Sequence, residues 1–145
     1  MFDATIERLV ALAVLMPIVA SMGGNAGTQT VTVAVRALAL RQIDRDAASG
    51  FVRRELVVAV LNGCLFAFLA ATMSYLWFKD ADIAAVMAVA MFANMVVAGL
   101  SGTLVPLGLV RAGVDPAVAS SVLITTITDV VGFFVFLGLA ALYLM

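Results

Sequence analysis

Asp129 is the residue whose type and position most directly suggest chemistry. It is the single charged side chain in a long apolar stretch near the end of the sequence. A carboxylate near the centre of a membrane helix costs about 2.5–3.5 kcal/mol on insertion scales, and it usually faces a water-filled cavity or a partner. At helical spacing, the hydroxyls of Ser121, Thr125 and Thr126 lie on or beside the Asp129 face. This face predicts the wall of a cation path, with Asp129 as the metal-binding residue.

The alternative interpretation of Asp129 is a protonated side chain that is hydrogen-bonded inside a helix bundle. No lysine, arginine or histidine lies in the middle of an apolar stretch to pair with it. The sequence has no histidine and a single cysteine, Cys64. These counts exclude a disulfide framework, a zinc site and Cys/His catalysis. No chemistry on a substrate is indicated, so we expect a protein that is not an enzyme.

The first apolar stretch contains a polar, glycine-rich segment from residue 21 to 30. Gly23 and Gly27 are four residues apart and permit close approach of helices, which predicts dimer packing. The polar residues of the segment continue along one helical stripe through Asn25, Gln29, Thr32 and Arg36. Both roles fit if this helix packs at a symmetry axis that is also a pore. We therefore expect the ion path to be lined by Gly23, Gly24, Asn25, Thr28, Gln29, Ser121, Thr125 and Thr126.

The elements that must position these residues follow from the hydropathy pattern. The chain has 145 residues, of which 65% are hydrophobic and 12% charged, with a mean hydropathy of +1.19. Four stretches are almost free of charge, at residues 9–35, 56–78, 83–110 and 117–145. Each is longer than the about 20 residues that cross a bilayer as a helix. The sequence predicts an all-α, polytopic membrane protein whose four transmembrane helices form one pore domain over residues 1–145.

The distribution of basic residues predicts the orientation. Six arginines lie in the first and third connections, whereas Arg8 and Lys79 alone lie on the opposite side. Because cytoplasmic connections are rich in Lys and Arg, we expect a multi-pass protein of the plasma (inner) membrane with both termini outside. The start of the chain is not basic, which argues against a signal peptide. An outside N-terminus without a signal indicates that an upstream segment with an odd number of spans is missing. The near balance of charge leaves no footprint for nucleic acid.

Several local patterns give further expectations. Asp115-Pro116 is typical of a helix N-cap followed by proline. We expect Asn62 and Asn94 to make structural hydrogen bonds. We expect Arg53-Arg54-Glu55 to be a cytoplasmic anchor with a satisfied acid or, alternatively, a contact for a missing soluble domain. Pro106 is expected to kink or break its helix. The remaining expectations are a polar turn over Arg45, Asp46, Ser49 and Gly50, and an interfacial anchor at Trp77.

These features together resemble the transmembrane domain of the MgtE family of magnesium channels. The resemblance is carried by residues 23–29 (GGNAGTQ), 36–39 (RALA), 115–117 (DPA) and 125–133 (TTITDVVGF), with Asn94, Gly102 and Pro106. It implies a homodimeric, Mg²⁺-selective channel whose subunit has five membrane helices, the first of them absent here. It also implies a cytoplasmic N-terminal domain and CBS modules that sense Mg²⁺. The family's pore aspartate matches Asp129, and its second and fifth helices, which line the pore, match the first and last stretches here.

The expected mechanism is passage of largely hydrated Mg²⁺. Mg²⁺ holds its waters tightly and takes one or two carboxylates. Two copies of Asp129 facing each other across a dimer axis would hold the ion through its waters, weakly enough for release. The alternative is a proton- or sodium-coupled divalent-cation exchanger in which Asp129 titrates. A non-transporting membrane module is a further alternative, but it leaves Asp129 without a purpose.

Overall fold

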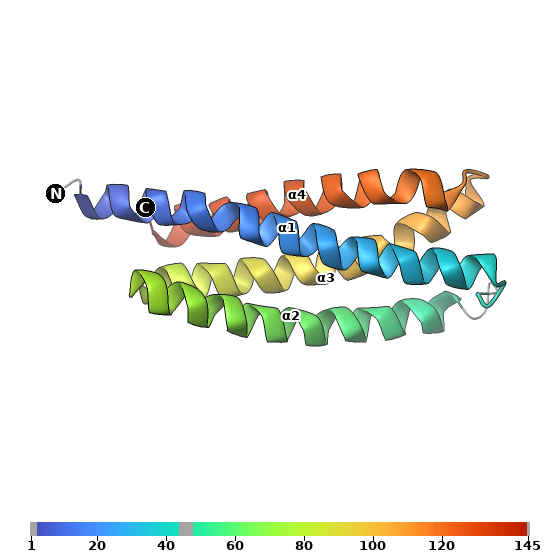
Figure 1. Ribbon diagram of the computed structural model, residues 1–145, viewed down its shortest axis with the longest axis horizontal. Helices are drawn as coiled ribbons and strands as arrows, with labels where there is room; N and C mark the ends of the chain where they lie inside the picture. Colours follow the sequence, from blue (N-terminus) through green and yellow to red (C-terminus); the bar gives the residue numbers. More distant parts are fainter. Residues whose placement is uncertain (1–2, 44–47, 145) are drawn as a thin grey trace.

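Four long helices make up the protein. A computed structural model describes residues 3–43 and 48–144. The helices run side by side along the length of the molecule (Figure 1). Their bounds are α1 Asp3–Ala39, α2 Ala48–Phe78, α3 Ala81–Arg111 and α4 Pro116–Tyr143.

All four helices are long and apolar enough to cross a membrane. The prediction of an all-α, four-span membrane protein is therefore confirmed. α1 and α2 extend well beyond their charge-free stretches, and α2 begins at Ala48, eight residues before its stretch. Ser49 and Gly50 consequently lie in the first turn of α2 and not in the predicted polar turn, whereas Arg45 and Asp46 are outside the described residues.

α3 is the central helix of the bundle. It packs against each of the other three helices, and α1 also packs against α4. α2 lies on the far side of α3 from α4 and packs extensively against α3 alone (Figure 1). In the most apolar 18-residue segment of α3, 56% of the residues are buried, whereas in the corresponding segment of α2 11% are buried. The pair α1–α4 and the outlying helix α2 are thus joined through α3.

The helix ends show why the chain turns where it does. The Asp80 side chain accepts hydrogen bonds from the backbone N–H groups of Asp82 and Ile83, at 2.9 and 3.3 Å, and so caps the start of α3. Arg8 of α1 pairs with Asp80 at 3.0 Å. At α4, Asp115 accepts from Ala117 N at 2.9 Å with proline at the first helical position, so the predicted N-cap is confirmed.

Pro106 does not break α3, which continues as a helix to Arg111. The C-terminal turns of α3 rise toward α4 (Figure 1). Because proline removes one helical hydrogen bond and crowds the preceding turn, a bend rather than an end is the expected result in a packed helix. The proline itself is buried against its neighbours.

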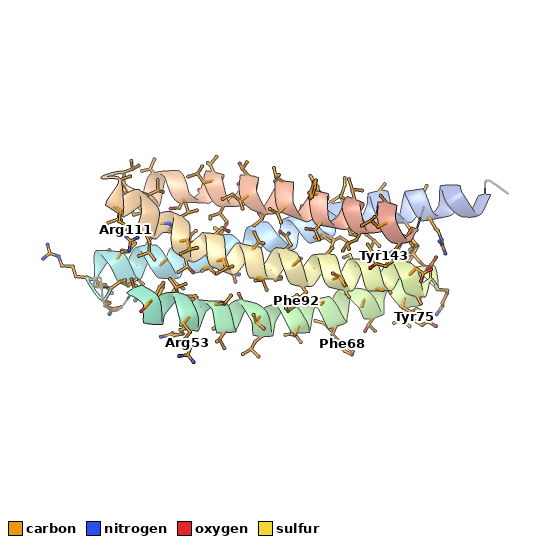
Figure 2. The ribbon with its side chains drawn as sticks, turned by 180° about the vertical axis from the view of Figure 1, so that it is seen from behind. Arg53, Phe68, Tyr75, Phe92, Arg111 and Tyr143 are labelled. Atoms are coloured by element: carbon orange, nitrogen blue, oxygen red, sulfur yellow. The ribbon has the colours of Figure 1, made fainter. Side chains whose placement is uncertain are left out.

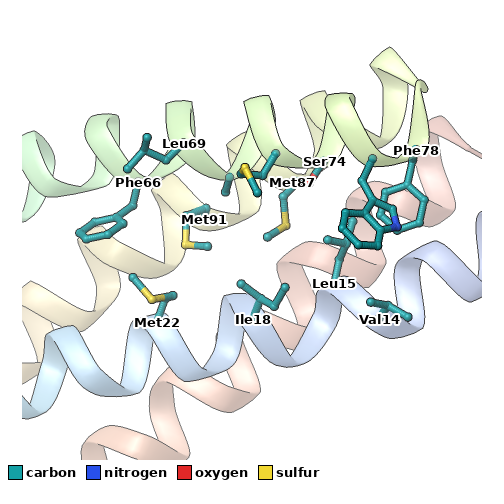
Figure 3. Close-up of a pocket in the computed structure, with 13 residues that line it drawn as sticks. Val14, Leu15, Ile18, Met22, Phe66, Leu69, Ser74, Phe78, Met87 and Met91 are labelled. Carbon is teal, nitrogen blue, oxygen red and sulfur yellow. The ribbon is translucent and has the colours of Figure 1, made fainter.

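An apolar groove separates α1 from α2 at the end of the bundle that holds the α2–α3 connection. It encloses about 490 Å³ over a floor of Met87 and Met91 from α3. Figure 3 shows Val14, Leu15 and Ile18 on the α1 side of this groove and Phe66 and Leu69 on the α2 side. Trp77, at the end of α2, also lines it and is 80% exposed. The groove is apolar and does not belong to an ion path.

Candidate ion path

The contact between α1 and α4 brings the two predicted polar segments together. Gly24 lies against α4, and a Cβ atom on it would lie 3.7 Å from Thr125 Cγ2 and 3.8 Å from Thr128 Oγ1. The absence of a side chain at Gly24 allows this approach. Thr128 is fully buried in the contact. It was not among the predicted site residues, because a threonine on an apolar helix carries no signal of its partner.

Polar side chains are exposed along both helices beside this contact. On α1 they are Ser21, Asn25, Thr28 and Thr32, and on α4 they are Ser121, Thr125 and Thr126. Thr125 connects the two sets, because its Cγ2 faces the side of α1 at Gly24 and the residue is also exposed. Polar groups that face lipid are costly, so a polar surface on membrane helices indicates a partner or a water-filled path.

Asp129 lies one helical turn beyond Thr125 on α4 and is half-buried. Within the described part of the chain its carboxylate makes no hydrogen bond, and the ion pairs found there all involve Arg8. Among the same residues, no three or more His, Cys, Asp or Glu side chains lie close enough together to hold a metal ion. A single chain therefore offers a cation one carboxylate and nearby hydroxyls, which does not make a cage for a dehydrated ion.

The threonine hydroxyls of the exposed polar surfaces on α1 and α4 are oriented by their own helices. Thr126 donates to Val122 O at 2.8 Å, and Thr28 donates to Gly24 O at 2.8 Å. Thr125 lies 3.1 Å from the carbonyl oxygens of both Ser121 and Val122. Because each hydroxyl hydrogen points back at a helix carbonyl, the oxygen lone pairs are left to accept hydrogen bonds from water. Such a surface suits the water shell of a hydrated cation.

The two glycines predicted to pack a dimer are both buried inside the single chain. A Cβ atom on Gly23 would overlap the side-chain amide of Asn94 on α3. One on Gly27 would overlap Ile124 Cγ2 on α4. The close approach indicated by their spacing is thus made to α3 and α4 of the same chain. Gly132 is likewise buried, against Asn94.

Gln29, which was predicted to line the ion path, lines a separate cavity of about 180 Å³ between α1, α2 and α3. Glu55 and Asn62 of α2 line the same cavity. Glu55 is buried, whereas Arg53 and Arg54 are exposed, and among the described residues no basic group lies within 4.0 Å of its carboxylate. Adjacent residues of a helix do not face each other, which is why the two neighbouring arginines are exposed while Glu55 is buried.

Four long apolar helices, two of which carry exposed polar side chains beside a half-buried carboxylate, define a polytopic membrane protein. A family model named MgtE and described as a divalent cation transporter matches residues 16–139. The chain belongs to the MgtE family, as the sequence resemblance predicted. The family is one of transporters, which agrees with the prediction that the chain is not an enzyme.

Three curated relatives carry the name magnesium transporter MgtE. The chain is 32% identical over 143 residues to the protein from Bacillus subtilis. It is 36% identical over 144 residues to that from Thermus thermophilus and 28% identical over 144 residues to that from Enterococcus faecalis. Each match covers 99% of this chain and 32% of the relative, so the chain spans about a third of the length of these proteins.

Proposed function

We propose that the chain forms the membrane pore of a Mg²⁺ channel, in which two copies enclose a path for largely hydrated Mg²⁺. The observation that carries the proposal is Asp129, a half-buried carboxylate without a partner in the described part of the chain, set beside the exposed polar surfaces of α1 and α4. The names of the three relatives supply the cation.

A second copy of the chain explains why polar side chains face outward. In a single copy, Asn25, Thr125 and Thr126 would meet lipid, which cannot satisfy them. A parallel dimer with its two-fold axis along the membrane normal would place these surfaces opposite each other, with water between them. Two Asp129 carboxylates would then offset the ion's charge, exclude anions and hold Mg²⁺ through its waters.

The arginines support a cytoplasmic location for the end of the bundle that holds the α1–α2 and α3–α4 connections. Figure 2 shows Arg53 and Arg111 toward that end, with Tyr75 and Tyr143 toward the other. This separation follows the distribution of positive charge in membrane proteins. In this orientation Mg²⁺ entering the cell leaves the pore past Arg36, which is exposed near the end of α1.

Ion flux into liposomes that contain the purified protein tests the proposal. Asp129→Asn keeps the size of the side chain but removes two negative charges from each dimer, so Mg²⁺ flux and competition among divalent cations are expected to collapse while the protein stays folded. Asp82→Asn is the matched control, because it makes the same charge change at an exposed position outside the path and should conduct like the parent.

Two results would overturn the proposal. The first is Asp129→Asn protein that folds, dimerises and still conducts Mg²⁺ at the parent rate, as expected if Asp129 is protonated and structural. The second is flux that requires a proton or sodium gradient, which is the behaviour of a coupled exchanger.

A further inference from the structure

We propose that Asn94 of α3 is a positioning residue that sets the separation of α1 and α4 beside Asp129. The inference rests on the proposed function, since it concerns the geometry of the same ion path. Its role is distinct from lining that path, because Asn94 is fully buried and reaches no surface.

The Asn94 side chain occupies space left by two glycines, one on each of the helices beside the path. On α1, a Cβ atom at Gly23 would overlap the amide. On α4, a Cβ atom at Gly132 would lie 2.8 Å from Asn94 Nδ2 and 3.2 Å from its Cγ. Contacts this short are closer than van der Waals packing permits. The flat amide therefore fits between two helix backbones and fixes how near each comes to α3.

A directed hydrogen bond holds α1 to this amide. Asn94 Nδ2 donates to Val19 O at 2.7 Å, and this carbonyl lies one helical turn before Gly23. A hydrogen bond depends on direction as well as distance, so it restrains the rotation of α1 about its own axis. That rotation decides which side chains of α1 are presented beside Thr125 and Asp129.

The chemistry of Asn94 favours a positional role over simple filling of the core. Its Oδ1 atom is buried and has no hydrogen-bond partner among the described residues. A buried acceptor without a partner is destabilising, and a leucine of similar size would avoid that cost. An apolar residue would supply neither the hydrogen bond from Nδ2 to Val19 O nor a flat group that fits between the two glycines.

The positions along the helices connect this contact to the ion path. Gly132 is three residues from Asp129 on α4, and Gly23 is two residues from Asn25 on α1. A displacement of either helix at its glycine therefore moves a path residue within one helical turn. Because α3 packs against both helices, it acts as a common reference for them.

A size exchange between Asn94 and Gly132 tests the inference in the reconstituted protein, with Mg²⁺ flux measured per folded molecule. Asn94→Ala empties the contact and Gly132→Ala overfills it, so each is expected to lower flux, by up to about 100-fold if the path residues move by about 1 Å, which is the loss that such a misplacement can cause at a catalytic site. The double variant Asn94→Ala/Gly132→Ala puts the new methyl group where the amide was and should recover flux well above that of either single variant.

Gly138→Ala is the matched control, because it adds the same methyl group to α4 where nothing lies within 4 Å, and it should conduct like the parent. The inference is overturned if the single variants lower thermal stability but leave flux per folded molecule unchanged, or if the double variant conducts no better than its parents. If Asn94→Ala does not fold, Gly132→Ala decides the question by the same criterion.

Asp129→Asn, measured alongside, separates this inference from the proposed function. Loss of flux in Asp129→Asn together with parent-like flux in Asn94→Ala and Gly132→Ala overturns the positioning role alone. Parent-like flux in Asp129→Asn overturns the proposed function, and the positioning role with it.

Discussion

At the scale of single residues, Gly27 shows how one absent methyl group decides the distance between two helices. A Cβ atom at this position would overlap Ile124 Cγ2, and Ile124 is β-branched and fully buried. Because that side chain has little freedom to move, we expect Gly27→Ala to lower the free energy of unfolding by about 1–3 kcal/mol. Thermal unfolding in detergent measures the change. Gly108→Ala, where a Cβ atom meets nothing within 4 Å, is the control and should be neutral or stabilising. Equal effects of the two variants would contradict the close packing of α1 on α4.

For several residues, the sequence predicted the kind of interaction but not the residue with which it is made. The spacing of Gly23 and Gly27 predicted close helix approach, and the structure makes it to α3 and α4 of the same chain. The prediction that Asn94 makes a structural hydrogen bond is confirmed, but its acceptor, Val19 O, lies 75 residues away and leaves no trace in local spacing. Glu55 has two adjacent arginines and still turns inward. Periodicity gives the face of a helix, whereas the neighbour of that face depends on the packing of the whole bundle.

At the scale of elements, the start of α3 offers a test of capping. Asp80 both caps the helix and pairs with Arg8. Asp80→Ala removes both interactions and is expected to lower the free energy of unfolding by about 1 kcal/mol. Asp80→Asn keeps the cap and loses only a partly exposed ion pair, so its loss should be smaller. Chemical or thermal unfolding of the two variants under the same conditions compares them. An equal loss would show that the ion pair, and not the cap, stabilises this end.

Hydropathy predicted that the four helices exist but neither their ends nor their places in the bundle. α2 begins at Ala48, several residues before its apolar stretch, because a helix continues into the interface where Arg53 and Arg54 reach water. The most apolar 18-residue segments of α2 and α3 have the same mean hydropathy, 2.2. In α2 11% of that segment is buried inside the bundle, whereas in α3 56% is buried. Lipid and protein interior are similarly apolar, so sequence alone does not separate an outlying helix from a central one.

At the scale of the whole molecule, the proposed dimer can be tested by cross-linking in bilayers. Thr126→Cys, in a Cys64→Ala background, puts a thiol on the exposed polar surface of α4. We expect disulfide-linked dimers, because this surface faces its symmetry mate. Leu61→Cys, on the exposed surface of α2, is the control and should stay monomeric. Monomer alone from Thr126→Cys, or equal dimer from both variants, would count against an interface formed by α1 and α4.

Trp77 gives the protein a fluorescent reporter that needs no labelling. It is the single tryptophan of the sequence, and it is 80% exposed at the end of α2, beside the apolar groove. Its emission therefore reports the membrane depth of a single position on α2, which is predicted to be the interface. Lipids that carry a heavy-atom quencher at successive positions along the acyl chain would locate that depth, and so measure how α2 sits in bilayers of different thickness. Because Trp77 lies at the end of α2 and is not part of the polar surfaces of α1 and α4, the signal remains usable in every variant of the ion path.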